Sequence, residues 1–185
     1  EDIATVKYDQ DGKELWTASF NAGGSANDVA SALRLDQEGN AYVAGTVYGS
    51  IGGDSQGANA DYITIKYDTE GKELWSVPYK GPGETQDIAH DMALDAFGDG
   101  YVLGSERGGP DGKTWMITVK LAADGSGLWV ARQQGVMSGR TGSLAADGLG
   151  NVWITGTAVG GRDYLTVKYA QSGNQAEAAK AGKPQ

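Results

Sequence analysis

The chain has 185 residues, a length that suits one domain with a sizeable buried core. Its formal net charge is −9 and its Lys and Arg residues form no cluster, which argues against nucleic acid as a partner. The absence of cysteine excludes disulfides and thiolate metal sites, and the longest apolar runs are too short to span a membrane. The 30 glycines, about twice the average frequency, indicate many short strands joined by tight turns.

The chain opens on a predicted β-hairpin. Residues 3 to 8 alternate apolar with smaller or polar side chains, and residues 13 to 20 form the returning strand, centred on Trp16. Between them, the sequence Asp9-Gln10-Asp11-Gly12 has the composition of a tight turn, in which Asp bonds its own backbone and Gly adopts a positive φ.

A second hairpin follows the loop at residues 21 to 28. Its strands cover residues 29 to 35 and 41 to 46, and its turn reads Asp-Gln-Glu-Gly-Asn. Similar turns recur at Asp95–Asp99 and Asp147–Asn151, each with glycine near its exit. The hairpin is therefore repeated within the chain, with the same backbone requirement each time.

The segment Ile63–Trp75 occurs four times in whole or in part. The other copies start at Ala4, Ile117 and Leu165, and each carries a lysine on its first strand. The period is about 50 residues, and four antiparallel strands per period is typical of a β-propeller blade. The complete unit that ends near residue 79 is expected to have strands at residues 29–35, 41–46, 62–67 and 72–79.

The sequence thus predicts an all-β fold of thirteen strands. It makes about three propeller blades of four antiparallel strands, and this chain alone does not close the ring. The sole segment that suggests a helix is Gln175 to Lys180, which is short and polar. The expected divisions are a partial blade at 1–23, blades at 24–83 and 84–136, a partial blade at 137–173, and a polar C-terminal tail at 174–185.

An incomplete last blade would leave an open sheet edge, and an unpaired edge invites another strand. We therefore expect a protein partner, either a second copy or another subunit, which completes the propeller or covers this edge. No nucleic acid and no transmembrane segment are expected.

The repeated residues resemble the bacterial SBBP repeat, a family named for a seven-bladed β-propeller. The resemblance covers roughly residues 2 to 173 and is closest at Asp61–Trp75, Asp36–Gly45 and Asp147–Gly156. The third copy departs from the pattern, with Leu121 in place of tyrosine, and the last copy lacks its final Lys-x-Leu-Trp strand. A weaker likeness, limited to the Gly-Lys-x-x-Trp run, links the chain to the tryptophan-docking repeats of quinoprotein dehydrogenases.

The resemblance implies a module of a larger secreted protein, without catalytic residues. The implied location is extracellular, periplasmic or associated with the cell envelope. The chain has no leader at its start, so a signal peptide is expected to be absent or already removed.

Five tryptophans and four lysines are the most prominent candidates for a binding site. Three of the tryptophans share one strand position, which favours packing between blades, with each indole N–H reaching a backbone carbonyl. The lysines lie between apolar neighbours, so we expect their stems along the sheet and their heads in solvent, without a bound anion. The residues concerned are Trp16, Trp75, Trp115, Trp129 and Trp153, and Lys7, Lys66, Lys120 and Lys168.

Acidic turns and the single histidine are weaker candidates. Asp9–Gly12 with Glu14 resembles the opening of a calcium loop, but the later ligands of that loop are missing, so we interpret it as a hairpin turn. His90, on the first strand of a blade, would have to serve any Ser-His-Asp triad, yet no nucleophile motif accompanies it. The carboxylate pairs Asp36/Glu38 and Asp95/Asp99 are expected to be solvated.

The sequence favours a non-enzymatic propeller scaffold that mediates protein–protein assembly. No catalytic, cofactor-binding or metal-binding residue is assigned, and Gly81-Pro82-Gly83 is interpreted as a loop, since no helix follows it. Partners are expected at the variable loops Tyr48–Ala60, Gly81–Asp87 and Arg107–Lys113. Two alternatives stay open: carbohydrate binding through Trp153 or Trp115, and a fragment of a quinoprotein-like enzyme.

Overall fold

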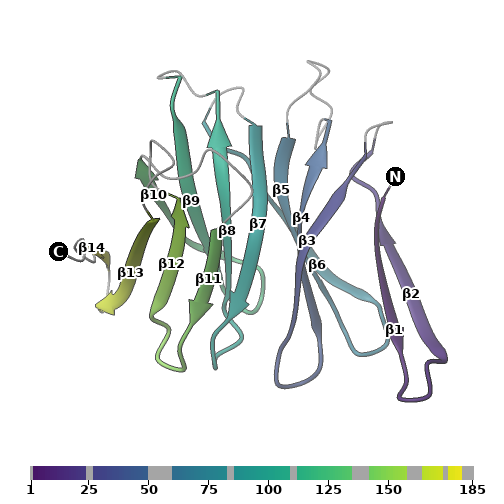
Figure 1. The fold of residues 1–185 in the computed structure, drawn as a ribbon. Helices are drawn as coiled ribbons and strands as arrows, with labels where there is room; N and C mark the ends of the chain where they lie inside the picture. Colours follow the sequence, from purple (N-terminus) through teal and green to yellow (C-terminus); the bar gives the residue numbers. More distant parts are fainter. Residues whose placement is uncertain are drawn as a thin grey trace.

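The described part of the chain is all-β and contains no helix. The computed structural model describes residues 2–23, 27–49, 60–82, 86–108, 112–134, 142–157, 164–172 and 175–180. Fourteen strands in these ranges form three sheets, none of which is closed (Figure 1). The predicted all-β class is confirmed.

By strand pairing, the chain divides into four consecutive units. The first unit contains β1 (Ile3–Tyr8) and β2 (Glu14–Phe20). The second contains β3 (Val29–Leu35), β4 (Ala41–Tyr48), β5 (Ala60–Tyr67) and β6 (Glu73–Tyr79). The third contains β7 (Gln86–Leu94), β8 (Gly100–Arg107), β9 (Thr114–Leu121) and β10 (Gly127–Gln134). The fourth contains β11 (Gly142–Ala146), β12 (Val152–Thr157), β13 (Tyr164–Ser172) and β14 (Gln175–Lys180).

Within each unit, consecutive strands pair antiparallel. One parallel bridge, between Ala60 and Gln86, joins the second and third units into an eight-stranded sheet. The first and fourth units lie at opposite ends of the molecule (Figure 1).

The predicted turns are present, and their aspartate and glycine residues close them. In the turn between β3 and β4, the Gly39 N–H bonds the Asp36 carbonyl at 3.1 Å, and Gly39 has a φ of +86°. The Asp36 side chain accepts the N–H groups of Glu38 and Asn40 at 3.1 and 2.8 Å. Aspartate and glycine therefore close the turn together, which fixes where the two flanking strands begin and end.

The core consists of three apolar clusters, each between two adjacent units. The cluster between the first and second units is built around Ile3 and Ile65, the next around Tyr62 and Val102, and the last around Met116 among others. An inner unit thus buries both faces of its sheet. Strands β4 and β5 are buried along almost their whole length for this reason, and β4 is a nearly continuous apolar segment.

The C-terminal segment differs from its prediction. Gln175–Lys180 is neither a helix nor a loose tail but the strand β14, and its backbone pairs with β13 from Val167 to Ser172. The expected count of thirteen strands is wrong, and β13 is not the open edge. Strand β14 is the outermost strand of that sheet instead, and β1, at the other end of the molecule, is one of several described strands that pair on one side only, because it pairs with β2 alone.

Within the described ranges, the structure contains no helix with the length and apolar character needed to cross a bilayer.

Candidate interaction surfaces

The acidic turns are held by their own backbones. Asp9 Oδ1 accepts the N–H groups of Asp11 and Lys13, both at 2.9 Å, and Asp68 makes the same pair of bonds in its turn. Glu14 accepts a hydroxyl from its own strand at 2.8 Å. In the described part of the chain, no three His, Cys, Asp or Glu residues are grouped so that they could hold a metal ion.

The prediction placed the heads of all four lysines in solvent, but two of the lysines are buried. Lys66 and Lys120 are 8% and 5% exposed. The ammonium of Lys66 lies 3.2 Å from the Asp36 carboxylate, and that of Lys120 lies 2.9 Å from the Asp99 carboxylate. The prediction of lysine heads in solvent is therefore wrong for this pair, and so is that of solvated carboxylates at Asp36, Asp95 and Asp99.

The pairing with Lys66 helps to lower the pKa of the Asp36 carboxyl group. Burial alone would raise its pKa, but hydrogen bonds from Asn40 and from Lys66 outweigh burial and lower the pKa below its usual value. The Asn40 amide donates to Asp36 Oδ2 at 2.9 Å, so both carboxylate oxygens are in use. A carboxylate bonded in this way stays ionised and holds the lysine beside it.

Tryptophan and lysine together connect each unit to the next. The Trp16 indole N–H donates to the Thr69 carbonyl at 2.9 Å, and the Trp75 N–H donates to the Ala123 carbonyl at 3.2 Å. In both cases the lysine of the same unit donates to the same carbonyl. The prediction that these indoles pack between units and reach a backbone carbonyl is confirmed at both positions.

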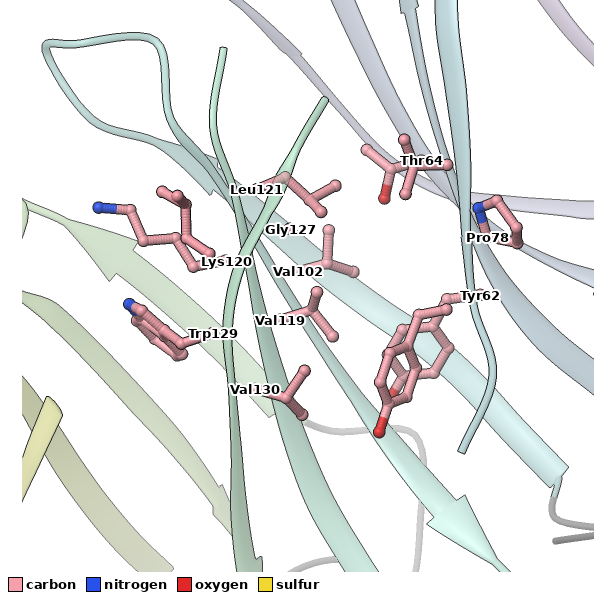
Figure 2. A pocket seen from close by; sticks show the side chains of 13 residues that line it. Tyr62, Thr64, Pro78, Val102, Val119, Lys120, Leu121, Gly127, Trp129 and Val130 are labelled. Atoms are coloured by element: carbon pink, nitrogen blue, oxygen red, sulfur yellow. The ribbon is translucent and has the colours of Figure 1, made fainter. Parts of the chain in front are cut away.

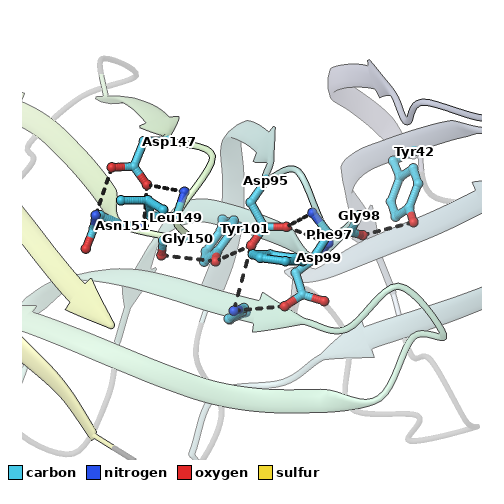
Figure 3. A network of polar contacts seen from close by, with 11 residues as sticks. Tyr42, Asp95, Phe97, Gly98, Asp99, Tyr101, Asp147, Leu149, Gly150 and Asn151 are labelled. Atoms are coloured by element: carbon cyan, nitrogen blue, oxygen red, sulfur yellow. Dashed lines mark hydrogen bonds and ion pairs between the residues drawn. The ribbon is translucent and has the colours of Figure 1, made fainter. Parts of the chain in front are cut away.

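Tyrosine hydroxyls make a second connection between units (Figure 3). Tyr42 donates to the Gly98 carbonyl at 3.1 Å, and Tyr101 donates to the Gly150 carbonyl at 3.3 Å. The Tyr101 hydroxyl also contacts the Asp95 carboxylate at 2.8 Å. The recurring polar residues are therefore used in contacts between neighbouring units.

The remaining tryptophans have different surroundings. Trp129 packs against the rings of Tyr101 and Tyr169, with centroids 6.0 and 5.7 Å apart. Trp115 is partly buried against the cluster between the second and third units. Trp153 is 36% exposed, and its ring lies under the ammonium of Lys168, 4.8 Å from the centroid.

His90 has a hydrogen-bond partner that sequence reasoning did not predict. Its Nε2 lies 3.0 Å from the Ser105 hydroxyl, on the neighbouring strand. Ser105 is only 2% exposed. Burial, together with the nearby Arg107 charge, lowers the pKa of His90 and favours the neutral imidazole. The pair is a partly buried contact between two strands of one unit.

Two further polar contacts were missed. Asp91 binds the Arg34 guanidinium at 2.8 Å and also accepts bonds from Ser143 and Leu144 at 2.9 and 3.1 Å, so it joins three units. Its partners lie more than 50 residues away in both directions. No local pattern could reveal such a contact.

The other missed contact is the ion pair between the buried Glu106 and the partly exposed Arg132. Tyr79 lies close to it: burial, and then the charge of Glu106, raises the pKa of this tyrosine to about 12. The raised pKa keeps the Tyr79 hydroxyl neutral near pH 7, which suits a structural contact between the second and third units.

The three variable loops fall largely outside the described residues. Of Tyr48–Ala60, the structure leaves out residues 50–59, and it also leaves out 83–85 and 109–111 in the other two loops. The described part of the second loop includes the Gly81 N–H, which donates to the Asp87 carboxylate at 2.6 Å. The expectation of partner binding at these loops stays a prediction.

The outer face of the first unit exposes residues that are buried elsewhere. Tyr8 is 58% exposed, whereas its repeat equivalents Tyr67 and Tyr169 are 2% and 4% exposed. Val6 is 39% exposed, whereas the equivalent Ile65 is fully buried. At the inner units, these positions pack against the sheet of the preceding unit. We call this surface, formed by Ala4, Val6 and Tyr8, the first-unit face.

The fourth unit has a matching exposed face on its opposite side. Tyr164 is 73% exposed, whereas the equivalent Tyr62 is 1% exposed. Trp153 is 36% exposed, whereas the equivalents Tyr42 and Tyr101 are fully buried. We call this surface, formed by Trp153, Tyr164 and Lys168, the fourth-unit face. Between them, the two ends of the molecule present both halves of the contact that joins adjacent units within it.

The chain matches no protein-family model, and no curated protein is similar enough to count as a match.

Proposed function

We propose that this protein is a non-enzymatic assembly module whose two exposed end faces bind β-sheets of another protein chain. A second copy of this chain fits the role, as does a different subunit built from the same repeat. The single observation that carries the proposal is the exposure of Tyr8 and Tyr164 at positions where the inner units bury their equivalents. Exposed aromatic surface of this kind marks interaction sites.

The fourth-unit face carries half of an inter-unit contact. Lys168 stands over the Trp153 ring as Lys66 stands over Tyr42 and Lys120 over Tyr101, at 4.8, 4.6 and 5.0 Å. In the second unit, Lys66 goes on to donate to a turn carbonyl of the next unit. On the fourth-unit face, the lysine and the aromatic ring are already in place for an incoming turn.

The first-unit face offers the turn that such a lysine would contact. In the repeat, Gln10 is equivalent to Thr69 and Ala123, the two residues whose carbonyls accept bonds from the preceding unit. Gly12 has open space where Gly71 contacts the Trp16 ring. Within the proposal, the Gln10 carbonyl and the space beside Gly12 receive side chains of the partner.

The unpaired edge of β1 supports the same role. An edge strand presents free backbone groups, and a further strand can pair with them. Four antiparallel strands in each of the last three units, together with face-to-face packing of successive units, agree with propeller blades, and we infer that the partner extends an incomplete ring. On the resemblance to the SBBP repeat, the proposed setting is an extracellular, periplasmic or envelope-associated complex.

Sedimentation velocity over a wide concentration range tests the proposal. We expect the purified chain to show a concentration-dependent rise in mass, or to co-purify with a partner whose mass adds to its own. A monomer at every concentration that also enters no complex in extracts would contradict it.

Carbohydrate binding is a second candidate, favoured by one observation. A hollow of about 280 Å³ on the fourth unit is lined by Trp153 together with Ser143, Thr155 and Thr166 and three apolar residues. An aromatic ring beside hydroxyl-bearing residues is suited to a sugar ring. Glycan-array binding that is lost on Trp153→Ala would support this candidate over the first.

A further inference from the structure

A cavity of about 300 Å³ lies between the outer strands of the second and third units (Figure 2). Four valines form much of its wall, together with Leu121, Leu128 and the side chains of Tyr62 and Tyr79. The one charged residue in the wall is Lys120, and its ammonium is already paired with Asp99 at 2.9 Å. The cavity therefore offers an apolar environment.

One residue of this wall differs from its equivalents in the repeat. Leu121 occupies a position that is tyrosine in the neighbouring units, at Tyr67 and at Tyr169. Each of these tyrosines is buried, and its ring lies near the tryptophan of the preceding unit: Tyr67 at 6.2 Å from Trp16, and Tyr169 at 5.7 Å from Trp129. Leucine brings no ring to the equivalent place.

The cavity is accessible from outside. Leu128 and Val130, both on β10, line it and are each 49% exposed. Its volume lies at the lower end of the range for ligand pockets, roughly 300 to 1,000 Å³. An engineered apolar cavity of about 150 Å³ already binds benzene in another protein.

We propose that this cavity binds a small uncharged aromatic molecule, of the size of phenol or indole. Its ring lies beside Leu121, between the valines of the wall. The walls provide apolar contact for both faces of such a ring, and Tyr62 and Tyr79, whose centroids are 5.3 Å apart, provide aromatic neighbours. A charged ligand is disfavoured, because it would lose its hydration without gaining a partner.

The test uses the residue that the other repeats carry. Indole is titrated into the purified chain and followed by calorimetry and by two-dimensional NMR, with glucose as a polar probe. The wild-type chain is expected to bind indole and not glucose. Leu121→Tyr, which restores the aromatic ring of the neighbouring repeats, is expected to weaken indole binding at least tenfold while keeping or raising Tm.

Two further variants keep the test decisive. Val130→Phe narrows the half-exposed mouth of the cavity and is expected to weaken binding as well, even if Leu121→Tyr folds poorly. Leu15→Tyr makes the same chemical change at a surface leucine of the first unit, 53% exposed, and is expected to leave indole binding unchanged. No indole binding to the wild-type chain, or equal binding to Leu121→Tyr and the wild type, would overturn the proposal. Neither result bears on the end faces, which lie elsewhere.

Discussion

Single side chains in this fold depend on partners that are distant in the sequence. Lys120 is 5% exposed and contacts Asp99, while the Asp95 carboxylate beside it is completely buried. Lys120→Met removes the positive charge and leaves these carboxylates without their cation. Loss of one partner of a buried pair costs about 3–5 kcal/mol, so we expect urea unfolding to show a loss of this size.

The exposed Lys72 provides the matched control for this prediction. Lys72→Met makes the same chemical change in a turn and is expected to alter the free energy of unfolding by less than about 0.5 kcal/mol. Equal losses for the two variants would show that the Lys120 ion pair adds no stability.

Because of His90, we expect the stability of the folded chain to depend on pH near neutrality. Burial, with the charge of Arg107, lowers the pKa of His90 in the folded chain below that of the unfolded chain. The unfolded chain therefore binds a proton more readily as the pH falls below about 6.5, and stability decreases. We expect the urea midpoint to fall between pH 7.5 and pH 5.5, and His90→Gln to show a smaller fall. The same decrease in both chains would assign the effect to other groups.

At the scale of strands and turns, glycine has two separate roles. Gly12 and Gly71 occupy equivalent turns with φ values of +80° and +85°. A Cβ on Gly12 would meet no atom within 4 Å, whereas one on Gly71 would lie 2.6 Å from the Trp16 ring. Gly12→Ala thus tests the backbone conformation alone, while Gly71→Ala tests the conformation and the contact between units.

We expect Gly12→Ala to cost about 1–2 kcal/mol, the usual penalty for a left-handed residue with a side chain. Gly71→Ala should cost about 1–3 kcal/mol more, because the indole must move or lose its bond to Thr69. Thermal and urea unfolding measure the difference. Equal costs would mean that the Trp16 ring adjusts freely.

The residues of the turns made most strands predictable. No such turn sequence borders β14, the strand that was missed. The Asp-x-x-Gly turns of β3–β4 and β5–β6 fixed the strand limits to within two residues. By contrast, Gln175–Lys180 contains no β-branched or aromatic residue, so its composition favours no strand. Its pairing with β13 provides the strand conformation, and such tertiary pairing cannot be read from local sequence.

The candidate site was predictable to a smaller degree. The shared position of Trp16 and Trp75 revealed an inter-unit contact, because a repeat shows the same packing demand several times. The burial of Lys66 and the bond of His90 to Ser105 were not predictable, because each partner lies on another hairpin or strand. The exposure of Tyr8 and Tyr164 follows only from their place at the two ends of the array.

At the scale of the whole molecule, the two end faces differ from each other. The first-unit face corresponds to one side of an inter-unit contact, and the fourth-unit face to the other, so self-association would be head to tail. Phe97, 71% exposed in a turn of the third unit, lies on neither face and serves as a control for the loss of exposed apolar surface.

This head-to-tail geometry predicts complementation between variants. Tyr8→Lys disables the first-unit face and Tyr164→Lys the fourth-unit face, so each variant alone is expected to lose closed or extended assemblies. Mixed together, they should form a 1:1 heterodimer, because each keeps the face that the other lacks. Native mass spectrometry with one isotope-labelled variant measures this, and Phe97→Lys should assemble like the wild type. If the mixture stayed monomeric while the wild type assembled, the contact would involve other surfaces.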